Sequence, residues 1–110
     1  MKILSAGLLG LKAEIIEVES CLGGGEMGLF TIVGLPDKAV SEARERVRGA
    51  IAGIGLKFPK RKIIVNLAPA DFKKHGPSYD LPIAISVLSN VYEFNKNISN
   101  DLFIGELSLK

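Results

Sequence analysis

The clearest structural signal in the sequence is the run FTIVGLPDKAVSEARERVRGAIAG, residues 30–53, which predicts a short strand followed by a long helix. Pro36 and Asp37 form a helix start signal, because proline suits a first turn and aspartate can cap free N–H groups. Gly53 and Gly55 predict the end of the helix. One apolar stripe recurs at spacings of three and four residues: Val40, Ala43, Val47, Ala50, Ile51 and Ile54.

Two more strands are predicted on the N-terminal side of this unit. Residues 3–11 carry no charge, and residues 13–22 alternate between two faces before a run of glycines. The first run is too short to span a bilayer and no clear cleavage site follows it, so it indicates a strand rather than a signal peptide. With the strand near 29–33, these runs predict an opening meander of up to three strands.

On the C-terminal side, residues 63–68 predict a buried strand and residues 69–77 a loop. A second helix follows, with Pro82 in its first turn and either Ser78 or Asp80 as its cap. Its apolar stripe is Leu81, Ala84, Ile85, Leu88, Val91 and Tyr92. A last strand is predicted at 102–107. The order βββαβαβ predicts an α+β two-layer sandwich, a mixed β-sheet with two helices on one face.

Length and composition limit the class of protein. The chain has 110 residues, which fits a single domain and is short for a self-contained nucleotide motor. A hydrophobic content of 47% with 24% charged residues excludes a disordered chain. With one cysteine and one histidine, neither a disulfide framework nor a zinc site is expected. Cys21 is interpreted as a small apolar residue near a strand end, in a reducing, cytoplasmic setting.

Nucleotide-binding motifs are weak or missing. The glycines at 23, 25 and 28 match the dinucleotide fingerprint, but that motif requires a helix directly after it, and here a strand is predicted. A flexible hairpin loop is the better interpretation. The sequence contains no Gly-x-x-x-x-Gly-Lys-Ser/Thr loop, so ATP hydrolysis by that route is not expected, and neither a cofactor nor a metal is predicted for this chain.

Basic residues gather locally, although the net charge is only +2. One cluster precedes the strand at 63–68 and another, Lys73, Lys74 and His75, follows it, so a straight strand separates them. The first interpretation is a solvated rim; the alternative is a surface that contacts phosphates. The candidate nucleic-acid-binding residues are Arg44, Arg48, Lys57, Lys60, Arg61 and Lys62. Aromatic residues are few, so base stacking is not expected.

The turn Gly76-Pro77-Ser78 brings a serine to the start of the second helix, whose N–H groups could stabilise an oxyanion. A serine nucleophile needs a base within reach, and His75 and Lys74 lie just upstream without a third group to orient them. Ser78 is therefore interpreted first as a helix cap. Asp80 would repel a second anion there, which favours the cap.

Four runs stand out in this order: FTIVGLPD at 30–37, EARERVR at 42–48, VNLAPAD at 65–71 and GPSYDLPIA at 76–84. Together they resemble the N-terminal domain of the YifB/ComM family of bacterial AAA+ ATPases, which are described as magnesium-chelatase-like or competence proteins. The resemblance covers nearly the whole chain. It implies one accessory domain, residues 1–110, with the fold of the Lon proteolytic domain and of a small-subunit ribosomal protein.

The resemblance also implies partners and a function. The ATPase module, with its ATP and Mg²⁺, would lie downstream and is absent from this chain; the family assembles as hexamers, and ComM members drive DNA branch migration in natural transformation. The expected partners are that module, DNA and further copies, without a membrane. The implied role is non-catalytic: assisting DNA engagement or ring assembly.

Two alternatives stay open under the same resemblance. The turn at Ser78 is similar to the turn that carries the Lon nucleophile, so one alternative is a Lon-like serine peptidase domain. Lon's partner lysine comes from a later segment that this chain does not reach, and Tyr79 and Asp80 replace a small Ala-Gly pair, which indicates a degenerate site. The other alternative is a pure structural scaffold.

Overall fold

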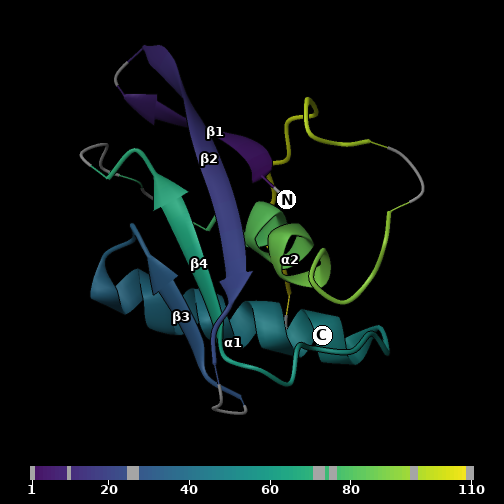
Figure 1. Cartoon of the computed structure of the whole chain (residues 1–110). Coiled ribbons are helices and arrows are strands. Elements are labelled where there is room, and N and C mark those ends of the chain that lie inside the picture. The colour runs from purple at the N-terminus through teal and green to yellow at the C-terminus, as the bar shows by residue number, and fades with distance from the viewer. Residues whose placement is uncertain are drawn as a thin grey trace.

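Four strands and two helices make up the part of the chain that the computed structural model describes, namely residues 2–9, 11–24, 28–70, 74, 77–94 and 97–108. They form one mixed sheet with both helices against it, which confirms the predicted α+β fold (Figure 1). In these residues neither helix is long and apolar enough to cross a membrane. The elements are β1 (Lys2–Leu9), β2 (Lys12–Leu22), β3 (Phe30–Val33), α1 (Asp37–Gly53), β4 (Ile63–Ala68) and α2 (Asp80–Leu88).

The strand order is β1-β2-β4-β3, so the predicted three-strand meander is wrong at its third member. β2 pairs antiparallel with β1 and β4, whereas β3 runs parallel to β4. β4 lies between β2 and β3, and backbone hydrogen bonds join its start to the segments on both sides. The N–H of Gly23 donates to the Lys62 carbonyl (2.6 Å), and the N–H of Ile63 donates to the Leu29 carbonyl (2.9 Å).

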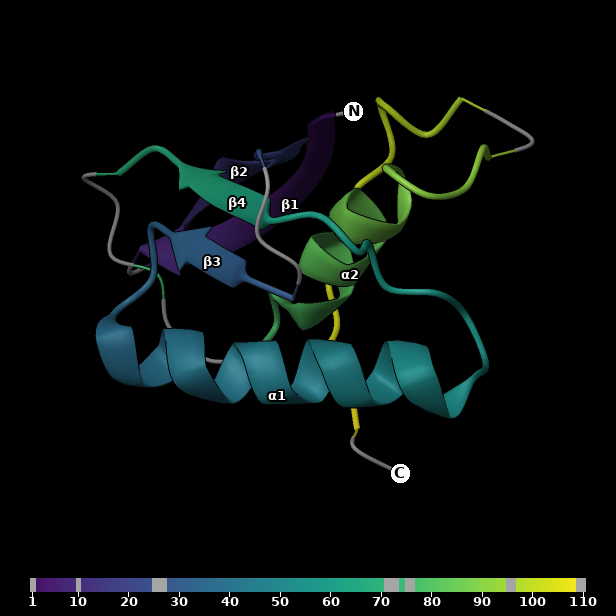
Figure 2. The same ribbon diagram turned by 60° about the horizontal axis from the view of Figure 1, so that its bottom comes forward.

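The core lies between one face of the sheet and the two helices (Figure 2). Every second residue of the strands points to the helices, as the period of two in a strand requires. Burying side chains of this size contributes about 1.5–3 kcal/mol each. The buried apolar side chains on the sheet are Ile3, Ile16, Val18, Phe30, Ile32, Ile63, Val65 and Leu67, and those on the helices include Ala43, Val47, Ile51, Ile83, Ala84 and Val87.

The first helix matches its predicted bounds closely, since it begins at Asp37, directly after Pro36, and ends at Gly53. The predicted capping by Asp37 is wrong, because Pro36 occupies the cap position and no side chain caps the helix, and Ile54 of the predicted stripe lies just beyond its end. Before it, Gly34 has φ +104°, and a Cβ at that position would collide with the carbonyl of Leu67. The tight turn from β3 into α1 therefore requires glycine.

The second helix is shorter than its apolar stripe suggested, since it stops at Leu88 and excludes Val91 and Tyr92. Polar side chains just beyond its end donate hydrogen bonds to a carbonyl of the last turn. The Ser89 hydroxyl and the Asn90 amide both donate to the Ser86 carbonyl, at 2.6 and 3.1 Å. Such local bonds compete with continued helix.

The predicted last strand at 102–107 is reduced to one bridge in the described residues. Leu102 pairs with Leu4 in parallel, and the Phe103 N–H donates to the Leu4 carbonyl (2.9 Å). Beyond that point the segment leaves the sheet, because its backbone groups bond to the start of α2. The Gly105 N–H donates to the Ser78 carbonyl (2.9 Å), and the Leu107 N–H donates to Asp80 (3.1 Å).

Candidate functional site

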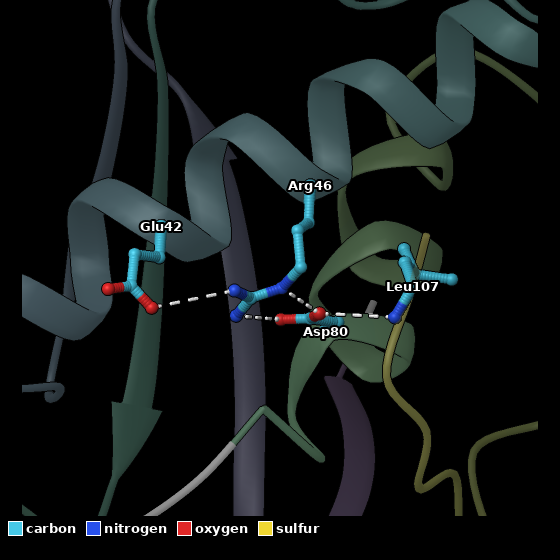
Figure 3. A network of polar contacts seen from close by, with 4 residues as sticks. All are labelled: Glu42, Arg46, Asp80 and Leu107. Carbon is cyan, nitrogen blue, oxygen red and sulfur yellow. Dashed lines mark hydrogen bonds and ion pairs between the residues drawn. The ribbon is translucent and has the colours of Figure 1, made fainter. Parts of the chain in front are cut away.

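Asp80, the first residue of α2, holds the most connected carboxylate among the described residues, and it is only 1% exposed. Arg46 of α1 donates two hydrogen bonds to this carboxylate: Nε to Oδ2 at 2.6 Å and Nη2 to Oδ1 at 3.2 Å (Figure 3). The Leu107 N–H adds a third bond at 3.1 Å. A two-pronged arginine–carboxylate pair is both strong and directional. Asp80 therefore ties α1, α2 and the C-terminal segment together.

The contact with Asp80 changes the pKa of Arg46. The hydrogen bond to Asp80 raises the pKa of Arg46 above its ordinary value, against the opposing effect of partial burial. Glu42, one turn earlier on α1, has its carboxylate 3.7 Å from Nη1 of Arg46, and this i,i+4 order of charges is favourable in a helix. The guanidinium is thus held between two carboxylates, and it stays protonated at any physiological pH.

A cavity of about 530 Å³ lies beside this network, between the first half of α1 and the loop before α2. Its charged lining carries both signs in equal number: Lys38, Arg46 and Lys74 against Glu42, Asp80 and Glu106. Lys74 is buried, and its Nζ donates to the Pro69 carbonyl at 2.6 Å. Within the described residues no group of acidic, histidine or cysteine side chains is arranged to hold a metal.

The first two N–H groups of α2 are already used within the chain, so they are not available to an oxyanion. The Asp80 N–H donates to the Pro77 carbonyl (3.1 Å), the Leu81 N–H donates to the Gly105 carbonyl (2.9 Å), and Pro82 has no N–H. The predicted capping role of Ser78 or Asp80 is wrong, because α2 has no side-chain cap and Tyr79 occupies the cap position. The returning segment at Gly105 supplies an acceptor instead. Ser78 itself is half-buried. Gly76 and His75 lie outside the described residues.

The arginines of the candidate nucleic-acid set meet around the connection between β2 and β3. Arg48 donates to the Gly28 carbonyl, Arg61 to the Gly23 carbonyl (3.3 Å) and Arg44 to the Phe30 carbonyl (3.1 Å). Arg48 also lies over the rings of Phe58 and Phe30, 4.8 and 5.5 Å from their centroids, in cation–π geometry. Gly25, in the glycine-rich part of this connection, lies outside the described residues.

The lysines of the same set lie in the segment between α1 and β4. Lys57 and Lys60 are exposed and Lys62 is half-buried beside Gly23. Lys74 follows the far end of β4 and lines the cavity instead, while Lys73 and His75 lie outside the described residues. The structure therefore brings Arg44, Arg48, Arg61 and Lys62 to one end of the sheet, with Lys57 and Lys60 on the segment that leads there.

Comparison with known proteins identifies the family. The family model described as subunit ChlI of Mg-chelatase matches residues 16–110 of this chain. The chain belongs to this family. It is 41% identical to the competence protein ComM of Haemophilus influenzae over 97% of its own length. It is also 46% and 47% identical to the uncharacterized protein YifB of Salmonella typhimurium and of Escherichia coli, in each case over 92% of its length.

These relatives confirm the resemblance of this ChlI-family chain to the YifB/ComM proteins. They are much longer, and the chain spans about a fifth of each: 21% of ComM and 20% of the two YifB proteins. All four runs on which the resemblance was based lie within the matched residues.

The Arg46–Asp80 pair of this family member was missed by sequence reasoning, which gave Asp80 only a capping role. One signal was available. Arg46 lies three residues after Ala43, and Ala43 belongs to the buried stripe of α1. A charged side chain at the border of a buried stripe needs a partner from a facing element. Which acid supplies it depends on the packing of α1 against α2.

Proposed function

We propose that this chain is the N-terminal accessory domain, residues 1–110, of a longer ComM/YifB-like AAA+ ATPase, and that it contacts DNA without catalysing a reaction. Membership of the ChlI family and the similarity to ComM support the assignment to such a protein. In this proposal ATP and Mg²⁺ belong to the ATPase module elsewhere in the polypeptide, which acts in the cytoplasm as a hexamer in DNA branch migration.

The proposed DNA contact rests on the cluster of basic side chains at one end of the sheet. Arg44, Arg48 and Arg61 are held by backbone carbonyls on both sides of the β2–β3 connection. Lys57 and Lys60 are exposed on the adjoining segment. Fixed arginines beside free lysines suit contacts with phosphates, which position a protein on DNA without reading its sequence.

The start of α2 supports a role without catalysis. Both N–H groups of its first two residues, Asp80 and Leu81, donate to carbonyls within the chain, and Pro82 has none to offer. These two N–H groups are therefore not available to stabilise the negative charge of a tetrahedral intermediate formed at Ser78. This geometry does not favour the Lon-like peptidase alternative.

The test is a titration of fluorescently labelled single- and double-stranded DNA with this chain over a range of salt concentrations. Binding should weaken steeply with salt, because each phosphate contact contributes about −0.9 to the slope of log K against log salt on duplex DNA. The double variant Lys57→Gln/Lys60→Gln should bind more weakly and lower the magnitude of that slope by about 2.

A matched control removes two exposed lysines elsewhere, with the same change in net charge. Lys12 lies at the β1–β2 hairpin and Lys38 at the start of α1. Lys12→Gln/Lys38→Gln should bind DNA like the wild type. Equal losses in the two double variants would contradict a localised contact. Absence of binding at low salt would contradict DNA engagement by this domain and favour a role in ring assembly.

A further inference from the structure

The segment that returns from the end of α1 to the start of β4 is fixed at residues 57 and 58 by contacts with distant parts of the chain (Figure 2). The Lys57 N–H donates a hydrogen bond to the Tyr92 hydroxyl at 2.8 Å. The next side chain, Phe58, packs against Phe30 with the two ring centroids 5.2 Å apart. These contacts hold the backbone that carries Lys57, and Lys57 itself is exposed.

The end of the same segment is fixed to the last residues before the β2–β3 connection. Arg61 donates to the Gly23 carbonyl at 3.3 Å, and the Lys62 carbonyl accepts the Gly23 N–H at 2.6 Å. Lys60 lies between the two fixed ends and is exposed. Within the described residues neither Lys57 nor Lys60 forms an ion pair. The segment therefore presents two unpaired ammonium groups on a backbone that is already held in place.

In the described part of the chain, the aromatic side chains that contact this segment are covered rather than open to bases. Arg48 lies over the ring of Phe58, 4.8 Å from its centroid, and over that of Phe30, which is only 2% exposed. Tyr92 is half-buried, and its hydroxyl accepts the Lys57 N–H. Proteins that bind single strands stack successive bases on aromatic side chains. The basic residues here are therefore suited to phosphates rather than to unpaired bases.

The basic residues at this end of the sheet and on the segment leading to it form one set, the cation cluster: Arg44, Arg48, Lys57, Lys60, Arg61 and Lys62. We propose that the cation cluster binds duplex DNA in preference to single-stranded DNA, and that Phe58 and Tyr92 are positioning residues for its lysines. This preference rests on the proposed DNA contact, to which it adds the class of DNA that is selected.

The physical reason is that a fixed set of cations matches a fixed array of phosphates. Duplex DNA carries one charge per about 1.7 Å of its axis, about twice the density of one of its strands. It is also stiff over the length of this domain, so its phosphates keep their spacing. A flexible single strand has to lose conformational freedom before its phosphates meet cations whose backbone is already held, and this loss weakens binding.

Fluorescence anisotropy with labelled duplex and single-stranded DNA of equal length, over a range of salt concentrations, tests the preference. Each phosphate contact contributes about −0.9 to the slope of log K against log salt on duplex DNA and about −0.7 on a single strand. With about four contacts and equal affinities at about 1 M salt, duplex DNA should bind about tenfold more tightly at about 50 mM salt.

The outcomes separate this preference from the DNA contact on which it rests. Equal affinities at low salt, or tighter binding of the single strand, would overturn the preference and leave the DNA contact standing. Absence of binding to either form would contradict the DNA contact itself.

Tyr92→Phe and Phe58→Leu test the positioning role. The first removes only the acceptor of the Lys57 N–H, and the second removes the ring that lies under Arg48. Both variants should bind duplex DNA several-fold more weakly and change single-strand binding less. The salt slope should stay the same, since no cation is lost. Circular dichroism should show that both variants stay folded.

Tyr79→Phe is the matched control, because it removes the same hydroxyl from a buried tyrosine that lines the cavity beside α2. It should bind both forms of DNA like the wild type. An equal loss of duplex affinity in Tyr79→Phe would overturn the positioning role, and so would equal losses for both forms of DNA in Tyr92→Phe and Phe58→Leu.

Discussion

At the residue scale, the buried carboxylate of Asp80 shows how one side chain can organise three segments. Its oxygens accept bonds from Arg46 of α1 and from the Leu107 backbone, while the residue itself begins α2. Burying a charge is costly unless it is paired and hydrogen-bonded. The bonds to Arg46 and Leu107 therefore offset the cost of burying the Asp80 carboxylate.

Replacing Arg46 tests the cost of leaving this carboxylate unpaired. Arg46→Ala should lower the free energy of unfolding by about 3 kcal/mol, the lower end for breaking a buried pair, because the arginine keeps some contact with solvent. Urea unfolding at neutral pH measures it. Glu42→Gln is the control: the Glu42 side chain is 58% exposed, so the loss should be only a few tenths of a kcal/mol. Equal losses of stability in the two variants would contradict the prediction that Asp80 is the main partner of Arg46.

Ionisation of Tyr79 should lower the stability of the fold at alkaline pH. Burial raises the pKa of Tyr79 above its ordinary value. A raised pKa in the folded state means that the neutral phenol stabilises the fold fully below the unfolded pKa of about 10, and that this contribution is lost as pH rises through the folded pKa. In a Tyr92→Phe variant, Tyr79 is the one remaining tyrosine. Its absorbance titration should have a midpoint above 10, the ordinary tyrosine pKa.

The same effect should appear in stability. Tyr79→Phe should show a smaller fall in unfolding free energy between neutral pH and strongly alkaline pH than the wild type, since the phenylalanine cannot ionise. A titration midpoint at or below the ordinary tyrosine pKa would contradict the effect of burial.

At the scale of elements, the turn between β3 and α1 restricts which residue the chain can carry at position 34. Gly34 has φ +104° and its backbone passes close to Leu67 of β4, so a residue with a side chain does not fit this turn. This angle lets α1 cross back beneath the sheet, so that β3 and β4 become parallel neighbours.

Gly34→Ala should destabilise the chain by more than about 1 kcal/mol, because alanine both disfavours this φ and collides with the Leu67 carbonyl. Gly53→Ala is a matched control at the end of α1. A Cβ at Gly53 would meet no atom within 4 Å, so alanine should be neutral or stabilising there. Thermal unfolding of the two variants compares them, and similar midpoints would argue against strain at Gly34.

At the scale of the whole molecule, the cation cluster and the Arg46–Asp80 pair lie at different places in the fold. The cations flank the β2–β3 connection at the start of β4, whereas the pair joins α1, α2 and the C-terminal segment. Lys57→Gln/Lys60→Gln should therefore leave the free energy of unfolding within about 0.5 kcal/mol of that of the wild type, as urea unfolding would show. A larger loss of stability would mean that weaker DNA binding by this variant reflects unfolding rather than a lost contact.

Local pattern alone determined much of this protein. The alternation at 13–22, the apolar run at 63–68 and the three-to-four spacing of α1 follow from backbone geometry, so the class of fold and most element bounds were predictable. The alternating burial of 63–68 came from the structure alone. The long motifs were equally sufficient for the family. Of the candidate site, the sequence supplied the basic residues without their arrangement, because their meeting at one end of the sheet depends on where β4 inserts.

The tertiary structure alone decided which elements became neighbours. Three sequence predictions were wrong for that reason: β4 lies where the meander placed β3, the start of α2 bonds to Gly105 instead of a side-chain cap, and the last strand shrinks to a bridge at Leu102. The Arg46–Asp80 pair belongs to the same class, since its members are far apart in sequence. Local propensity says which groups need partners; packing of distant segments decides which partners they find.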